Sequence, residues 1–102
     1  MSDKRKYPRV EAFLDARWQG TMANCNVRIA DLSEGGCYID TIGEVIVGEP
    51  LLLKILMPNG QTLDLEGIVV HHSPRLGFGV RFVNLSEKQR SQVRSLIESK
   101  NE

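Results

Sequence analysis

The stretch LLLKILMPNGQTLDLEGIVVHH, residues 51–72, predicts two paired β-strands. Alternate positions in its first half are apolar and fall on one face of an extended strand: Leu51, Leu53, Ile55 and Met57. The Asn59-Gly60 pair that follows is a strong signal for a two-residue type I′ turn. We therefore expect residues 51–58 and 61–72 to form a β-hairpin around this pair.

Four further runs of β-forming residues lie on either side of the hairpin, separated by glycine, proline and asparagine. They are residues 11–18, 25–31, 37–41 and 77–83. A set of short hairpins of this size usually closes into a small barrel, because closure removes the exposed strand edges. The expected fold is all-β, a six-stranded antiparallel β-barrel over residues 11–84.

The end of the chain has a helical pattern. Ser86 and Gln89 have the spacing of a capping box, in which each side chain bonds to the backbone of the other residue. The apolar positions that follow form a single stripe: Val93, Leu96 and Ile97. We expect a C-terminal α-helix over residues 86–99, packed on the barrel by this stripe.

The composition is that of one ordinary globular domain. Of 102 residues, 41% are hydrophobic and 25% are charged, and thirteen Lys and Arg balance thirteen Asp and Glu. No apolar run approaches the roughly 18 residues of a membrane span, and the charged N-terminus is not followed by the apolar segment of a secretory signal. We expect a single domain over residues 1–102, no membrane insertion and a cytoplasmic location.

The cysteines and histidines give no pattern of a metal or redox site. Cys25 and Cys37 lack the CxxC spacing, which favours buried free thiols. His71 and His72 are neighbours in an expected strand, so their side chains point to opposite faces and cannot easily bind one metal. We expect no metal site and no cofactor.

A dense positive charge stands at the N-terminus of this otherwise neutral chain. The segment KRKYPRVEAF, residues 4–13, contains Arg5 and Arg9 in the spacing RxxxR. It carries no apolar anchor before Val10, and its cationic side chains repel one another when no anion is present. We expect residues 1–10 to form a flexible arm that a bound anion would order.

A second motif follows the second expected strand. The segment DLSEGG, residues 31–36, places Asp31, Ser33 and Gly36 in the spacing DxSxxG. We predict a turn here, whose two glycines, Gly35 and Gly36, permit positive φ.

The two motifs in this order resemble the signature of the PilZ domain family, RxxxR followed by [DN]xSxxG. PilZ domains also have a six-stranded barrel, a late strand like GFGVRF and a C-terminal helix, so the resemblance covers nearly the whole chain. Members of that family are receptors for the bacterial second messenger cyclic di-GMP. The resemblance therefore implies cyclic di-GMP as the ligand and a bacterial cytoplasm as the location.

The chemistry of the motif residues suits this ligand, which presents two phosphates and two guanines. Arg5 and Arg9 carry guanidinium forks, which can clamp a phosphate or contact guanine O6 and N7 together. Asp31 can accept hydrogen bonds from guanine N1 and N2. Ser33 supplies a small hydroxyl, and Gly36 lets the backbone approach the ligand closely.

Three further residues are candidates for the site: Lys4, Gly35 and Arg81. The resemblance implies that a long cationic residue just before RxxxR accompanies an intercalated pair of ligands, so Lys4 predicts two nucleotides per domain. Arg81 either joins the site or faces solvent from the last strand, and the sequence leaves both open. Trp18 is expected in the core or against the helix, with stacking on a purine as the alternative.

Each motif alone has a simpler explanation, because a short basic run is usually a solvated tail and the side chains of an Asp-x-Ser turn usually bond to the turn's own backbone.

The alternative function is a small β-barrel that binds single-stranded nucleic acid. A pI near 6.7 and an aromatic content of 6% argue against it. No GxSxG nucleophile motif is present. We predict no enzyme activity and no DNA or RNA partner.

The absence of a catalytic or output domain in 102 residues favours a stand-alone adaptor. Such a protein would bind cyclic di-GMP, change conformation and signal to a protein effector that the sequence does not identify. The outputs that the resemblance implies are motility, biofilm formation, exopolysaccharide production or virulence.

Overall fold

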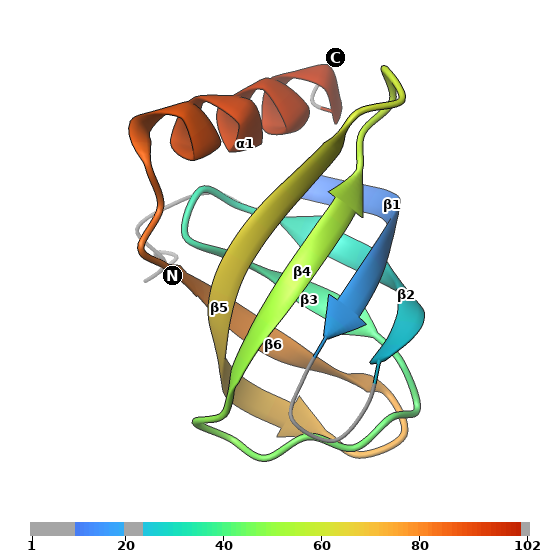
Figure 1. Cartoon of the computed structure of the whole chain (residues 1–102). Helices are drawn as coiled ribbons and strands as arrows, with labels where there is room; N and C mark the ends of the chain where they lie inside the picture. The colour runs from blue at the N-terminus through green and yellow to red at the C-terminus, as the bar shows by residue number, and fades with distance from the viewer. Residues whose placement is uncertain (1–9, 20–23, 101–102) are drawn as a thin grey trace, which may run out of the picture.

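The computed structural model describes residues 10–19 and 24–100 as six β-strands followed by one α-helix. The elements are β1 (Val10–Gln19), β2 (Asn24–Leu32), β3 (Gly36–Asp40), β4 (Pro50–Leu56), β5 (Thr62–Ser73), β6 (Gly77–Val83) and α1 (Glu87–Lys100) (Figure 1). All neighbouring strands are antiparallel, and they form a closed barrel in the order β1-β2-β3-β6-β5-β4. The predicted all-β barrel with a C-terminal helix is confirmed.

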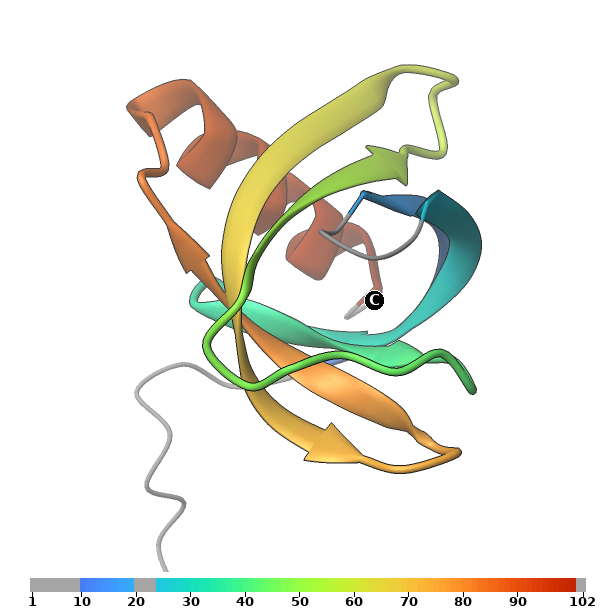
Figure 2. The same ribbon diagram turned by 60° about the horizontal axis from the view of Figure 1, so that its bottom comes forward.

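Two pairings between strands far apart in sequence close the barrel. β1 pairs with β4 from Ala16 opposite Ile55 to Gln19 opposite Leu52. β3 pairs with β6, and this pairing places Gly36 next to Arg81. Every strand therefore has a neighbour on both sides, and Figure 2 shows the strands curving around a common interior with α1 behind them.

The interior is filled by alternate residues of each strand, as the period-two pattern predicts. Trp18 and Phe78 lie at its centre, with ring centroids 5.0 Å apart in an edge-to-face arrangement. Trp18 is 1% exposed, so its sequence-based placement in the core is confirmed and stacking on a bound purine is not available to it. The two cysteines are free thiols: Cys37 is buried, whereas Cys25 is only half-buried.

The hairpin between β4 and β5 is confirmed, but the predicted type I′ turn is wrong. The Gly60 N–H donates to the Met57 carbonyl at 2.9 Å, which places Pro58 and Asn59 at the centre of the turn. A type I′ turn needs positive φ at both central residues, and proline cannot adopt it. The positive φ falls instead on Gly60, at +89°, one position after the central pair. Proline at the first central position favoured this longer loop.

The helix begins with the predicted capping box. The Ser86 N–H donates to Gln89 Oε1 at 2.8 Å, and the Gln89 N–H donates to Ser86 Oγ at 3.1 Å. Val93 and Leu96 are buried and Ile97 is half-buried. This stripe packs α1 across the barrel against β1 and β5 (Figure 1). In the part of the chain that the structure describes, no helix is long and apolar enough to cross a membrane.

Candidate functional site

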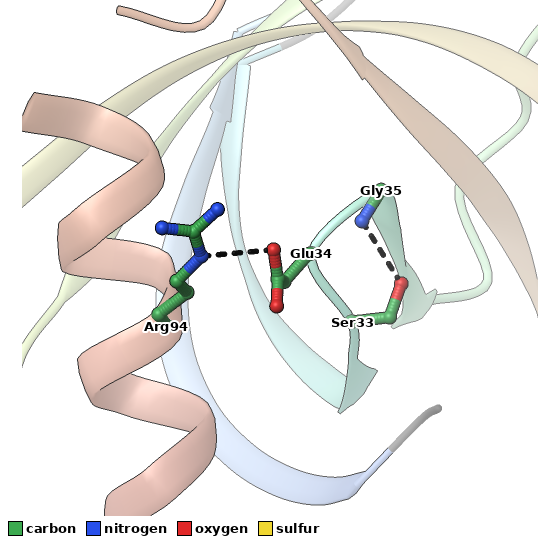
Figure 3. Close-up of polar contacts among 4 residues, drawn as sticks. All are labelled: Ser33, Glu34, Gly35 and Arg94. Carbon is green, nitrogen blue, oxygen red and sulfur yellow. Dashed lines mark hydrogen bonds and ion pairs between the residues drawn. The ribbon is translucent and has the colours of Figure 1, made fainter. Parts of the chain in front are cut away.

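The turn at residues 33–36 connects β2 to β3, and the side chain of Ser33 shapes it. The Ser33 N–H donates to the Gly36 carbonyl at 2.8 Å. Ser33 Oγ accepts hydrogen bonds from the N–H groups of Gly35 and Gly36, both at 3.2 Å, and the Gly35 bond is drawn in Figure 3. Ser33 is only 6% exposed. The sequence therefore folds locally into a turn that is closed by its own serine.

The Ser33 hydroxyl has its hydrogen-bonding capacity filled by this turn. Its oxygen accepts two bonds, and it lies 3.3 Å from the Gly36 carbonyl oxygen, to which it donates its single proton. We expected Ser33 to offer a hydroxyl to a ligand. The structure gives it an additional task, which is to hold the backbone of the turn in one shape.

Gly36 lies where β3 runs close to β6. A Cβ atom at this position would overlap the carbonyl oxygen of Val80 in the facing strand. Gly36 does not have a positive φ; among the described glycines, that conformation occurs at Gly48, Gly60 and Gly77. Neither Gly35 nor Gly36 therefore uses the positive φ that a glycine permits, and close packing of two strands is the reason for a glycine at position 36.

Asp31 lies near the end of β2, two residues before the turn. It is opposite Glu11 of β1 and Tyr38 of β3, and its side chain is half-buried in the barrel wall. The register between β2 and β3 shifts next to it, between Ile29 and Asp31. A bulge of this kind increases the local twist and redirects side chains, which is common beside binding sites.

Arg81 of β6 is the cationic residue that the barrel brings to the turn. It is exposed and pairs directly with Gly36, the last residue of the motif. The Phe82 N–H, next in the chain, donates to the Gly35 carbonyl at 2.9 Å and ties the turn to β6. The sequence left open whether Arg81 joins the site or faces solvent. In the structure Arg81 faces solvent and also lies beside the motif turn.

The structure also places two residues at the turn that the sequence motifs did not mark. Arg94 Nε of α1 donates to Glu34 Oε1 at 3.0 Å, so an ion pair joins the turn to the helix (Figure 3). Glu34 occupies an unspecified position of DxSxxG, and its partner is 60 residues away. No local pattern in the sequence could have identified this pair.

Three of the predicted site residues, Lys4, Arg5 and Arg9, lie outside the described residues. The described part of the site therefore consists of Asp31 and the turn on one side and Arg81 on the other.

Within residues 10–19 and 24–100, no group of three or more potential metal ligands is found. His71 is exposed and bonds to Ser73 Oγ at 2.9 Å, whereas His72 is half-buried.

Comparison with known proteins gives a consistent result. A sequence model described as "PilZ domain" matches residues 3–99. The inhibitor of motility MotI (DgrA) of Bacillus subtilis has a TM-score of 0.80 at 16% identity, over 98% of this chain and 52% of MotI. The PilZ domain of Escherichia coli YcgR, solved with c-di-GMP, has a TM-score of 0.79 at 17% identity, over 97% of this chain and 92% of that domain.

A third similar structure is PlzA of Borreliella burgdorferi in complex with c-di-GMP. Its TM-score is 0.70 at 16% identity, over 93% of this chain and 41% of PlzA. The chain thus spans about half the length of MotI and less than half that of PlzA. No curated protein matched the sequence.

At these identities the solved structures establish the fold, and the sequence model extends the match to nearly the whole chain. The matched range includes the motif turn, the closed barrel and nearly all of the C-terminal helix. The chain therefore belongs to the PilZ domain family.

Proposed function

We propose that this protein is a receptor for cyclic di-GMP in a bacterial cytoplasm. The observation that carries the proposal is the preformed turn at residues 33–36, with Asp31 before it and the exposed Arg81 beside it. Family membership supports the same ligand, because the similar PilZ structures of YcgR and PlzA were solved with c-di-GMP.

The proposed contacts follow from the donors and acceptors that each group offers. Asp31 accepts from the N1 and N2 donors of a guanine, which a cationic side chain cannot read. Arg5 and Arg9 clamp a phosphate or the O6 and N7 edge of guanine. The turn contributes a rigid backbone surface, because its amides are held by Ser33 and its Gly35 carbonyl is held by β6. A turn that is already ordered before binding lowers the entropic cost of binding.

The proposed output is signalling by an adaptor that is not an enzyme. A ligand held between the N-terminal segment and the turn would contact both, and such differential contacts are what a ligand needs to shift a conformational equilibrium. The reorganised surface would then bind a protein effector. Motility, biofilm formation, exopolysaccharide production and virulence are the processes proposed for control by that effector.

Calorimetric titration tests the ligand. We expect binding of cyclic di-GMP and much weaker binding of cyclic di-AMP and GTP, because adenine lacks the O6 acceptor and the N2 donor. Asp31→Ala should weaken binding by about 1 to 3 kcal/mol, the usual scale for a lost hydrogen bond to a charged group. Asp40→Ala is the matched control, because Asp40 is an exposed carboxylate at the far end of β3.

The same titration measures the stoichiometry, for which we expect two nucleotides per domain. Unchanged affinity in Asp31→Ala, Arg5→Ala and Arg9→Ala would show that the proposed site is wrong. A one-to-one titration at saturating ligand would contradict only the expected pair.

A further inference from the structure

A pocket of about 440 Å³ lies against the motif turn, between the end of β6 and the start of α1. Its lining residues are Glu34, Gly35, Arg81, Phe82, Asn84, Leu85 and Arg90. The volume falls within the usual range of small-molecule sites, about 300 to 1,000 Å³. The pocket therefore adjoins the proposed ligand site, and part of its wall is the turn itself.

Two arginines from different elements give this pocket its charge. Arg81 comes from β6 and Arg90 from the first turns of α1. Glu34 is the only acidic residue in the lining, and its carboxylate is already bonded to Arg94 at 3.0 Å. Within the described residues, neither Arg81 nor Arg90 has an ion pair. The pocket thus carries excess positive charge, because its one acidic residue, Glu34, is already paired with Arg94 of α1.

The backbones of both arginines are fixed beside the pocket. Arg81 is paired with Gly36, so no β3 side chain lies beside it at that register. The backbone of Arg90 is fixed by its N–H, which donates to the Ser86 carbonyl at 2.9 Å in the capped first turn. Phe82 and Leu85 also line the pocket and supply apolar surface. Guanidinium groups on rigid elements match the oxygens of a phosphate, because each group offers several donors in one plane.

We infer that this pocket is a phosphate subsite, in which Arg81 and Arg90 bind a phosphate of the cyclic dinucleotide held at the turn. The inference rests on the proposed function and adds Arg90, a helical residue that neither sequence motif marks. A phosphate bound by both arginines connects β6 to α1. Ligand binding would then also stabilise the position of the helix on the barrel.

Calorimetry with cyclic di-GMP and residues 1–102 tests this subsite. Arg90→Gln should weaken binding about tenfold, the scale of one charged hydrogen bond, which corresponds to about 1.4 kcal/mol. Lys88→Gln is the matched control, because it removes the same charge from an exposed position of the same helix outside the pocket. The control should bind within about twofold of the wild type, since an exposed charge contributes little. Arg90→Lys should recover part of the loss, because lysine keeps the charge without the planar fork.

Arg81→Gln is the second variant, and circular dichroism checks that each variant keeps the barrel and the helix. A shift of the Arg90 Nε–Hε signal in NMR spectra on addition of cyclic di-GMP is the expected direct readout. If Arg81→Gln and Arg90→Gln bind like Lys88→Gln while Asp31→Ala is weakened, the subsite is wrong and the proposed function stands. If the wild type binds no cyclic di-GMP, the proposed function and the subsite are both overturned.

Discussion

At the scale of single residues, the motif turn depends on two residues that act in different ways. Ser33 holds the turn through hydrogen bonds to its own backbone, and Gly36 allows β3 to pack against β6. Both residues are needed to build the site, whether or not they also touch a ligand. Loss of binding in variants at either position therefore has to be compared with loss of stability.

We predict that Gly36→Ala destabilises the barrel by about 2 kcal/mol or more, because the new methyl group overlaps a backbone oxygen that cannot move without shifting β6. Gly79→Ala is the matched control on the facing strand. The nearest atom that its Cβ would meet is His71 Cβ at 3.7 Å, an ordinary contact. Chemical denaturation of both variants measures the difference. Equal stability of the two would show that β3 and β6 are not packed as described.

Ser33→Ala should cost about 1 to 3 kcal/mol of unfolding free energy, because the substitution removes the acceptor of two N–H groups in a buried turn. Ser95→Ala, at an exposed position of α1, is the control and should change stability by less than about 0.5 kcal/mol. Thermal and urea unfolding measure both. A neutral Ser33→Ala would mean that water replaces the hydroxyl at the turn.

At the scale of elements, the turn between β2 and β3 is joined to two other parts of the molecule. The Gly35 carbonyl bonds to β6, and Glu34 bonds to Arg94 of α1 (Figure 3). The turn therefore connects the barrel wall to the helix that lies across it. If the proposed ligand binds at the turn, this connection would give the helix a physical route by which to respond to it.

A double-mutant cycle should detect the link between turn and helix. With Glu34→Gln, Arg94→Gln and the double variant, we expect a coupling free energy of about 0.5 kcal/mol that decreases in 1 M salt. The side chains are 29% and 51% exposed, which limits the value. Lys54 and Asp64 form the comparison pair, because their charged atoms are farther apart, at 3.8 Å, and their carboxylate is more exposed, at 72%. A coupling no larger than that of this pair would argue against a role for Glu34 in positioning the turn.

At the scale of the whole molecule, the closed barrel offers little freedom for a large change of shape, since every strand is paired on both sides. A conformational response must therefore involve segments attached to the barrel. We propose the N-terminal segment with Arg5 and Arg9 and, through Arg90, the helix α1.

Limited digestion with trypsin tests the N-terminal part of this response. The bonds after Lys4, Arg5 and Lys6 should be cut more slowly with cyclic di-GMP than without it, because contacts with the ligand would order the segment against the barrel. The bond after Arg75, exposed in the connection between β5 and β6, is the internal control and should be cut at the same rate in both cases. Equal rates at saturating nucleotide for the N-terminal bonds would show that this segment is not the switch.

The sequence by itself determined the barrel, the helix with its cap and the location of the motif turn. These features depend on short-range patterns: alternation along strands such as residues 51–56, and the three-residue spacing of Ser86 and Gln89. Even here the local pattern had a limit. Asn59-Gly60 indicated a turn, but the proline before it set which residues occupy the turn's centre.

Only the tertiary structure decided what surrounds the turn. Gly36 is a glycine because Val80 lies against it, and Glu34 bonds to a residue 60 positions away. Arg81 and Arg90 share a pocket because β6 and α1 meet at the turn. None of these contacts has a local signature, because they arise when strands and a helix distant in sequence are brought together to bury one common core.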